Sequence, residues 1–392
     1  MSQHNQNDAE QHQLKFSTKL LHFGSEIDRS TGASSVPIYQ ASTFHHEDIF
    51  NPPQHDYSRS GNPTRQALED YIALLEGGVR GFAYSSGMAA ISSTFMLLSA
   101  GDHMIVTEDV YGGTYRLLTM ILNRLGIEST FVDMTDLDQV KAALKPNTKA
   151  VYMETPSNPT LKITDIAAVT SWAKEHGLIT MLDNTFMTPY YQRPIEHGVD
   201  IVLHSATKFL GGHSDVLAGL AVASTPSLGR QLKQLQNGLG TVLGVQDSWL
   251  LMRGMKTLGA RMEHSEISAR KLAEWLAQRH DIDAVYYPGL KHHPGRLIHE
   301  KQSTGYGAVV SFDVGSGERA KQVLSRVEIP LVAVSLGAVE SILSYPAMMS
   351  HAAMPPEVRR ERGITDGLIR FSVGLEDIDD LIHDLEQALQ TS

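Results

Sequence analysis

A lysine follows directly on a buried strand in the segment 201–213. The apolar run 201–203 predicts a short strand, and Lys208 comes just after it, ahead of two glycines that permit a sharp turn. A lysine in that position is costly to bury unless it has a partner or a function. One such function is an imine with a carbonyl cofactor, because partial desolvation lowers the pKa of the amine and makes it nucleophilic. The alternative is a lysine on the surface of a loop.

A second apolar run, 178–182, ends in an acid. Asp183 lies before Lys208 in the chain, at a separation that leaves room for one loop and one further strand of an α/β sheet. A buried carboxylate beside a pyridine nitrogen keeps that nitrogen protonated and makes the ring an electron sink. Ser205 and Thr207 alternate along the strand end, so their hydroxyls share one face and could bind a phosphate. Acid, lysine and hydroxyls together are the groups that pyridoxal 5′-phosphate requires. Taken alone, Asp183 is also compatible with a helix N-cap or a turn.

Strand and helix patterns alternate from residue 81 onward. We expect strands at 82–84, 104–107, 123–132, 149–154, 177–183 and 200–204. Ligands of open α/β sheets bind at the carboxyl ends of the strands. Three motifs fall there: a small-residue turn at Gly87 and Met88 that favours an anion, Tyr111, which could stack on a flat ring, and a rigid loop with Asn158. The small-residue turn is also compatible with simple tight packing.

Tyr57 and Arg59 precede a predicted helix start. Asn62 followed by Pro63 is a typical cap and first-turn pair. An arginine and a phenol just outside that start could bind phosphate, and a solvated loop is the alternative.

The pattern changes after a long predicted helix at 246–277, in which a bend is expected near Gly254 or Gly259. Strands are expected at 285–287, 308–312, 331–334 and 368–373, with shorter helices between them, which indicates a smaller α+β domain. Ser335 follows one apolar strand, and Arg370 interrupts another. A lone arginine there needs an anion, such as a substrate α-carboxylate. A structural salt bridge is an equally open interpretation.

Composition limits the remaining possibilities. Among 392 residues the net charge is −11, which argues against nucleic acid as a partner, and the absence of cysteine excludes disulfides and thiolate metal sites. The histidine pairs at 45–46 and 292–293 lack ligand spacing, so we expect no metal. There is no signal peptide and no membrane-spanning run, so a cytoplasmic enzyme is expected. We predict an arm at 1–60, disordered over its first 13 residues, a cofactor domain at 61–255 and a C-terminal domain at 256–392.

Seven segments carry a resemblance to a known family: YSRSGNPTR, SSGMAA, DVYGGTYR, ETPSNPT, DNTF, HSATKFLGGHSD and SLGAVES. From about Ser17 onward the chain resembles the pyridoxal-phosphate-dependent enzymes of Cys/Met metabolism, and within them the bacterial cystathionine β-lyases most. The resemblance implies the fold-type I transferase architecture. In that architecture a large α/β domain with a mostly parallel seven-stranded sheet precedes a smaller α+β domain. It also implies a homotetramer of two dimers, with active sites shared between subunits.

The resemblance also implies roles. Lys208 would hold the cofactor as a Schiff base and remove the Cα proton, Asp183 would pair with the pyridine nitrogen, and Tyr111 would stack on the ring and assist proton transfer. The remaining cofactor and substrate contacts would come from Gly87, Met88, Ser205 and Thr207 at the phosphate, Tyr57 and Arg59 from a neighbouring subunit, and Asn158, Ser335 and Arg370 at the substrate and the cofactor oxygen.

Two positions separate members of the family. Methionine γ-lyases carry a cysteine where this chain has Gly113, and many γ-lyases and γ-synthases carry a glutamate where it has Val334. Valine can neither bind a distal ammonium nor move a second proton, which favours β-elimination. The expected reaction converts L-cystathionine to homocysteine, pyruvate and ammonia in methionine biosynthesis. A γ-lyase, a γ-synthase or a mixed lyase is the alternative, and a non-catalytic protein of this fold is a remote one. A dinucleotide dehydrogenase lacks support because no G-x-G-x-x-G follows a strand.

Overall fold

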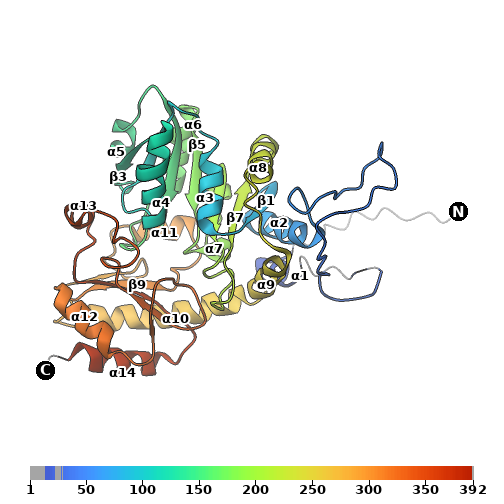
Figure 1. The fold of residues 1–392 in the computed structure, drawn as a ribbon. Helices are drawn as coiled ribbons and strands as arrows, with labels where there is room; N and C mark the ends of the chain where they lie inside the picture. Colours follow the sequence, from blue (N-terminus) through green and yellow to red (C-terminus); the bar gives the residue numbers. More distant parts are fainter. Residues whose placement is uncertain (1–13, 23–27, 29, 391–392) are drawn as a thin grey trace, which may run out of the picture.

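Two β-sheets organise the chain, and helices pack against both of them (Figure 1). The computed structural model describes residues 14–22, 28 and 30–390. The predicted disorder of residues 1–13 therefore lies outside the described residues. None of the described helices is both long enough and apolar enough to cross a membrane.

The first sheet has seven strands and is mostly parallel, as expected. Only the pairings of β7 with β1 and β6 are antiparallel, while the other four strand pairings are parallel. In spatial order the strands are β1 (Arg80–Tyr84), β7 (Gly219–Ala223), β6 (Ile201–Ser205), β5 (Ile179–Asp183), β4 (Thr148–Glu154), β2 (His103–Thr107) and β3 (Glu128–Val132). The central strands are continuous apolar runs because both faces of this sheet are covered.

Separate hydrophobic clusters cover the two faces of this sheet. On one face α2 (Pro63–Glu76) and α6 (Ile166–Glu175) pack through Ile72 and Val169 against strand residues such as Leu182. On the other face α3 (Gly87–Phe95) and α8 (Pro226–Leu239) pack through Phe95 and Leu232. The remaining elements around this sheet are α1 (Phe16–His22), α4 (Gly112–Arg116), the π-helix η1 (Leu117–Leu122), the 3₁₀ helix η2 (Asn123–Leu125), α5 (Leu137–Ala142), α7 (Thr188–Tyr191), the 3₁₀ helix η3 (Pro194–His197) and α9 (Val245–Met255).

Helix α2 starts as the sequence predicts. The Asn62 side-chain oxygen accepts a hydrogen bond from the Thr64 backbone N–H at 2.9 Å, and Pro63 occupies the first turn. The helix ends at Gly77, whose φ of 74° is a left-handed conformation that glycine adopts without steric cost.

The second sheet has five strands and a core of its own. Its order is β10 (Leu331–Val332), β11 (Ile342–Ser344), β12 (Leu368–Ser372), β9 (Val309–Asp313) and β8 (Ala284–Tyr286). Residues of α10 (Leu258–Ala277), α12 (Gly317–Arg326) and α14 (Ile378–Leu389) complete its hydrophobic cluster. The short helices α11 (Arg296–Gln302) and α13 (Pro356–Glu361) lie in its connections. This is the smaller α+β unit that the sequence indicates.

Three expectations about elements were wrong in detail. The predicted helix 246–277 is two helices rather than one bent helix, and they meet at Lys256 and Thr257, between the two glycines near which a bend was expected. The predicted strand 123–132 begins only at residue 128, because a 3₁₀ turn occupies its first residues. Strands β7 and β11 were not predicted: β11 has only three residues, and β7 consists of small apolar residues that give no distinctive period.

Candidate active site

Polar side chains meet at the carboxyl edge of the first sheet. Asp183 is the last residue of β5, and Ser205 is the last residue of the neighbouring strand β6. Lys208 follows three residues later, in the turn that the two glycines close. The structure therefore brings the predicted acid, hydroxyl and lysine to one edge, where strand ends leave backbone groups free for ligands.

Lys208 points toward the second half of the chain. Its Nζ donates a hydrogen bond to Ser335 Oγ at 2.6 Å. Burial lowers the pKa of this amine from 10.5 to about 8, and the charge of Arg370 adds to the effect. The side chain is partly buried, so a surface loop lysine does not describe it. An amine with this pKa can act as a nucleophile and as a base near neutral pH.

Ser335 occupies an unusual backbone conformation. Its φ is 99°, which a residue other than glycine rarely adopts. Its carbonyl oxygen accepts a hydrogen bond from Arg370 Nη2 at 2.7 Å, and nearby the backbone N–H of Gly337 donates to Ser372 Oγ at 2.7 Å. Such a conformation persists where the surroundings determine it, and it is common at functional sites.

Arg370 is a buried cation with an incomplete set of partners. Its side chain comes from β12 and is 3% exposed. Nη1 donates to Asn158 Oδ1 at 2.8 Å, while Nε has no partner. Among residues 30–390 no carboxylate forms an ion pair with it, so a structural salt bridge does not account for its burial. Burial lowers its pKa to about 10, and Tyr111 opposes that shift. The guanidinium is available for a ligand carboxylate.

Asp183 is a half-buried acid with hydrogen bonds but no cation partner in the described part of the chain. Oδ1 accepts the Thr185 backbone N–H at 3.0 Å, and Oδ2 accepts the Tyr152 hydroxyl at 3.4 Å. Burial raises the pKa of the carboxyl group, and the hydrogen bonds from Thr185 oppose that shift. The bond to Thr185 is that of a turn, so the turn interpretation of this residue also holds. A carboxylate in this setting is stabilised by a cationic ring nitrogen.

The small-residue turn before α3 lies against the end of β6. Ser86 caps the helix by accepting the Ala89 N–H at 3.0 Å, which leaves the first N–H groups of α3, at Gly87 and Met88, without an intrahelical acceptor. A Cβ added to Gly87 would lie 2.8 Å from the Cβ of Ser205. Helix start and serine thus form the two sides of an anion cradle. Thr207 lies beside them but exchanges hydrogen bonds with Ala218, at 3.2 and 3.0 Å.

Tyr111 lies at the start of α4, and the residue is 37% exposed. Gly113 lies under that ring: a Cβ at Gly113 would be 2.5 Å from Tyr111 Cε1 and 2.9 Å from Met88 Sδ. The ring therefore occupies the space that a larger residue at 113 would need. Its position beside the helix start of α3 is suited to stacking on a bound ring.

Tyr57 and Arg59 lie apart from these residues. Tyr57 is 46% exposed, and Arg59 Nη1 donates to the carbonyl and the side-chain oxygen of Asn237, at 2.6 and 2.9 Å. Within the described ranges no hydrogen bond connects either of them to Lys208, Asp183 or Ser205. In Figure 1 the segment that carries them extends away from the two sheets.

One buried group at this edge was not found from the sequence. Glu154 ends β4 and is the register partner of Asp183 in β5. Its Oε2 accepts the Tyr111 backbone N–H at 2.9 Å. The signal was the same one that identified Asp183, an acid at the end of an apolar strand.

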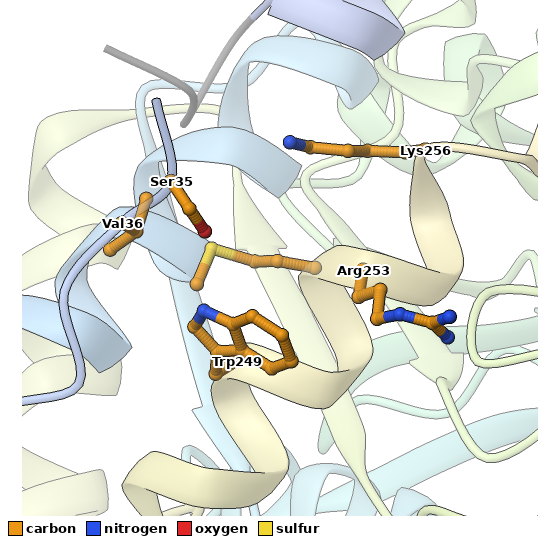
Figure 2. Close-up of a pocket in the computed structure, with 6 residues that line it drawn as sticks. Ser35, Val36, Trp249, Arg253 and Lys256 are labelled. Carbon is orange, nitrogen blue, oxygen red and sulfur yellow. The ribbon is translucent and has the colours of Figure 1, made fainter. Parts of the chain in front are cut away.

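A cleft elsewhere on the molecule contains none of these residues. Figure 2 shows Trp249 and Arg253 on α9, with Lys256 beyond its end and Ser35 and Val36 from the N-terminal segment. Met252 completes its lining. It presents two cations and an indole, but it contains neither Lys208 nor Asp183, which the predicted chemistry requires.

Comparison with known proteins agrees with this geometry. A profile of the family described as Cys/Met metabolism PLP-dependent enzyme matches residues 17–390. The chain belongs to this family. It is 62% identical to cystathionine β-lyase MetC of Bacillus subtilis, over 97% of both chains, and 53% identical to cystathionine γ-lyase of the same organism, over 96% of this chain and all of that one. A crystal structure of cystathionine γ-lyase from Lactobacillus plantarum in complex with L-serine is 50% identical, covers 96% of this chain and 98% of its own, and superposes with a TM-score of 0.94.

The site residues fit the cofactor of this family. A partly desolvated amine at Lys208 suits covalent attachment, and the unpaired acid at Asp183 suits a protonated pyridine nitrogen. The helix start at Gly87 and the adjacent Ser205 suit a phosphate. As a member of the family the protein is a pyridoxal-phosphate-dependent enzyme with the fold-type I architecture.

Proposed function

We propose that the protein is a cystathionine β-lyase, which converts L-cystathionine and water to homocysteine, pyruvate and ammonia. The observation that carries the choice of β- over γ-elimination is Val334, which precedes Ser335 and is 66% exposed. It places an aliphatic side chain where a γ-enzyme would have a carboxylate for the distal ammonium or for a second proton transfer. The Bacillus subtilis β-lyase is more similar to this chain than the γ-lyase of the same organism, at 62% against 53% identity.

Substrate orientation starts at Arg370. Its buried guanidinium, braced by Asn158 and the Ser335 carbonyl oxygen, binds the α-carboxylate of the substrate. The bidentate contact places the substrate Cα near Lys208, because Ser335 also holds the lysine amine.

Proton transfer is assigned to Lys208. Its amine takes the Cα proton and is suited to this because its pKa is about 8 rather than 10.5. The bound cofactor supplies the electron sink for the charge released at Cα. Asp183 keeps the proton on the ring nitrogen, and Tyr111 holds the ring in place by stacking and assists proton transfer at the substrate.

The experiment that tests this function is product analysis. Purified protein incubated with L-cystathionine is expected to release pyruvate and homocysteine in equal amounts. Release of 2-oxobutyrate and cysteine instead would establish the alternative, a γ-lyase. The 53% identity to such an enzyme supports this alternative. Absence of both keto acids with cofactor bound would point to a γ-synthase, testable with an acylated homoserine and cysteine, or to the remote non-catalytic alternative.

We further propose a homotetramer with active sites shared between subunits. Support comes from the N-terminal segment, which exposes Ile49 by 76% and Phe50 by 86% and so leaves apolar surface for a second copy to cover. Tyr57 and Arg59 would then reach the cofactor phosphate of that copy. Mixing subunits with Tyr57→Phe and subunits with Lys208→Ala should restore part of the activity, since each mixed dimer keeps one intact site. No recovery in mixed oligomers would contradict site sharing.

The remaining assignments follow the same proposal. The arm comprises residues 1–60, the cofactor domain 61–255 and the C-terminal domain 256–392; the interruption between α9 and α10 supports the second boundary. The enzyme would act in the cytoplasm, in methionine biosynthesis, without nucleic acid or membrane partners.

A further inference from the structure

Glu154 is a buried carboxyl group to which the proposed reaction gives no role. Its side chain is 6% exposed at the end of β4. In the described portion of the chain no lysine, arginine or histidine forms an ion pair with it. An acid in such a place is costly to keep unless its contacts serve a purpose.

The contact that Glu154 makes is with the backbone of Tyr111. Its Oε2 accepts the Tyr111 N–H at 2.9 Å, across the gap between the end of β4 and the loop that follows β2. A second carboxyl group connects the same two segments in the opposite direction: Asp109 accepts hydrogen bonds from Ser157 and Thr160. The loop that carries Tyr111 is therefore held to the loop after β4 by two buried acids, and only Glu154 bonds to Tyr111 itself.

Glu154 and Asp183 also share one face of the sheet. They are register partners in the parallel pair β4–β5, and Tyr152, two residues earlier in β4, donates its hydroxyl to Asp183. Two carboxylates side by side in a buried setting cannot both ionise at low cost. Burial and the neighbouring Asp183 accordingly raise the pKa of Glu154 well above its ordinary value.

We propose that Glu154 is a positioning residue, which holds the backbone of Tyr111 so that the phenol ring keeps its place on the cofactor ring engaged by Asp183. This inference rests on the proposed roles of Tyr111 and Asp183. Without the acceptor, the Tyr111 N–H loses its hydrogen bond, and the start of α4 can shift together with the ring that packs over Gly113. A displacement of this kind alters ring stacking while leaving Lys208 and Arg370 in place.

The test compares three substitutions in the holoenzyme. Glu154→Gln keeps an oxygen acceptor of the same reach and is expected to behave like the wild type. Glu154→Met keeps the volume but removes the acceptor, and we expect about 10- to 100-fold losses in cofactor affinity and in kcat/KM, the scale of a misplaced catalytic contact. Glu154→Asp shortens the side chain by one methylene and moves the carboxyl group away from the Tyr111 N–H. If the methionine variant fails to fold, this variant replaces it, and the same losses in cofactor affinity and in kcat/KM are expected. Cofactor affinity is read from the visible absorption of the protein-bound cofactor on dilution.

A double-mutant cycle with Tyr111→Ala separates positioning from general stability. If Glu154 acts through Tyr111, Glu154→Met costs little further affinity or activity once the ring is absent. Equal losses in both backgrounds, or a loss in Glu154→Gln as large as in Glu154→Met, would overturn the inference. Glu108→Gln is the matched control: Glu108 lies three residues before Tyr111 but pairs with Lys162 at 2.6 Å, so its loss should leave cofactor affinity unchanged. Cofactor affinity is measured without substrate, so this result does not depend on whether β- or γ-elimination is catalysed.

Discussion

Lys208 Nζ lies 2.6 Å from Ser335 Oγ, in a hydrogen bond between residues 127 positions apart in the chain. The amine projects from the edge of the first sheet, and the hydroxyl belongs to the segment between β10 and β11 of the second. The same serine offers its carbonyl oxygen to Arg370. One residue with φ of 99° thus fixes the distance between the proposed base and the proposed carboxylate-binding group.

Replacement of Lys208 tests the central assignment. Lys208→Ala is expected to abolish turnover and the visible absorption of lysine-bound cofactor, because no other amine forms a hydrogen bond to Ser335 Oγ in the described chain. Spectra and keto-acid release measure both effects. Lys145→Ala removes an exposed lysine paired with Glu128 and serves as the control. Retained turnover in the Lys208→Ala protein would show that Lys208 is not the residue that transfers the Cα proton.

The lowered pKa of Lys208 predicts a pH dependence of stability. Unfolded, the amine has its ordinary pKa of 10.5; folded, its pKa is about 8. Between these values the unfolded chain holds a proton that the folded chain has released, so this group makes the free energy of unfolding rise with pH. Below about pH 8 both states are protonated and the slope vanishes. Denaturant titrations of cofactor-free wild type and Lys208→Met should therefore diverge in favour of the wild type from about pH 8 upward; parallel curves would contradict the shift.

Arg370→Ala should raise KM far more than it lowers kcat. Loss of a desolvated partner for the substrate carboxylate costs roughly 2–5 kcal/mol of binding free energy. Steady-state kinetics with L-cystathionine give both constants. Arg359→Ala is the matched control, since Arg359 is also buried but pairs with Asp366 at 2.5 Å; it should lower the melting temperature and leave KM unchanged. An unaltered KM in Arg370→Ala would make this arginine structural.

Gly113→Ala should displace the Tyr111 ring. The added Cβ would lie 2.5 Å from Tyr111 Cε1, and the partly exposed ring gives way more readily than the helix backbone. We expect kcat/KM to fall by about tenfold or more, with a small change in melting temperature. Gly238→Ala in α8 is the control, because no atom lies within 4 Å of its added Cβ; it should gain up to about 1 kcal/mol of helix stability. Unchanged kinetics in Gly113→Ala would show that the ring tolerates the methyl group.

Val334→Glu should move the product ratio toward 2-oxobutyrate. The side chain is 66% exposed, so a carboxylate can be introduced beside Ser335 without the cost of burying a charge. Quantification of both keto acids from L-cystathionine measures the shift. Val332→Glu, two residues earlier and 43% exposed, adds the same charge away from Ser335 and should leave the ratio unchanged. Equal ratios in wild type and Val334→Glu would mean that this position does not select the reaction.

The parts of the candidate site that the sequence predicts from residue patterns are those whose pattern lies in neighbouring residues of the chain. Asp183 and Lys208 each follow an apolar strand, and parallel strands bring their carboxyl ends to one edge whatever the details of packing. The cap at Asn62 and the turn at Gly87 are likewise set by neighbouring residues. The seven-stranded sheet was expected from the family resemblance, whereas the short strands β7 and β11 gave no pattern of their own.

Long-range partners had no such signal. Arg370 and Asn158 are 212 positions apart, so the sequence left a salt bridge and a ligand contact equally open, and only the fold shows which acceptors surround the guanidinium. The interruption between α9 and α10 also depends on tertiary packing. A Cβ at Gly254 would lie 2.3 Å from the Gly211 carbonyl oxygen, so that glycine serves close approach rather than a bend.

The loop that carries Lys208 is enclosed by residues from the second half of the chain. A Cβ on Gly337 would lie 2.6 Å from the Phe209 nitrogen, and the Gly212 carbonyl oxygen accepts the Val339 N–H at 2.8 Å. These contacts restrain the loop that carries Lys208, so a rotation of the second sheet relative to the first would strain them. Substitutions remote from the cofactor that loosen this contact are therefore expected to change the rate of proton transfer by Lys208.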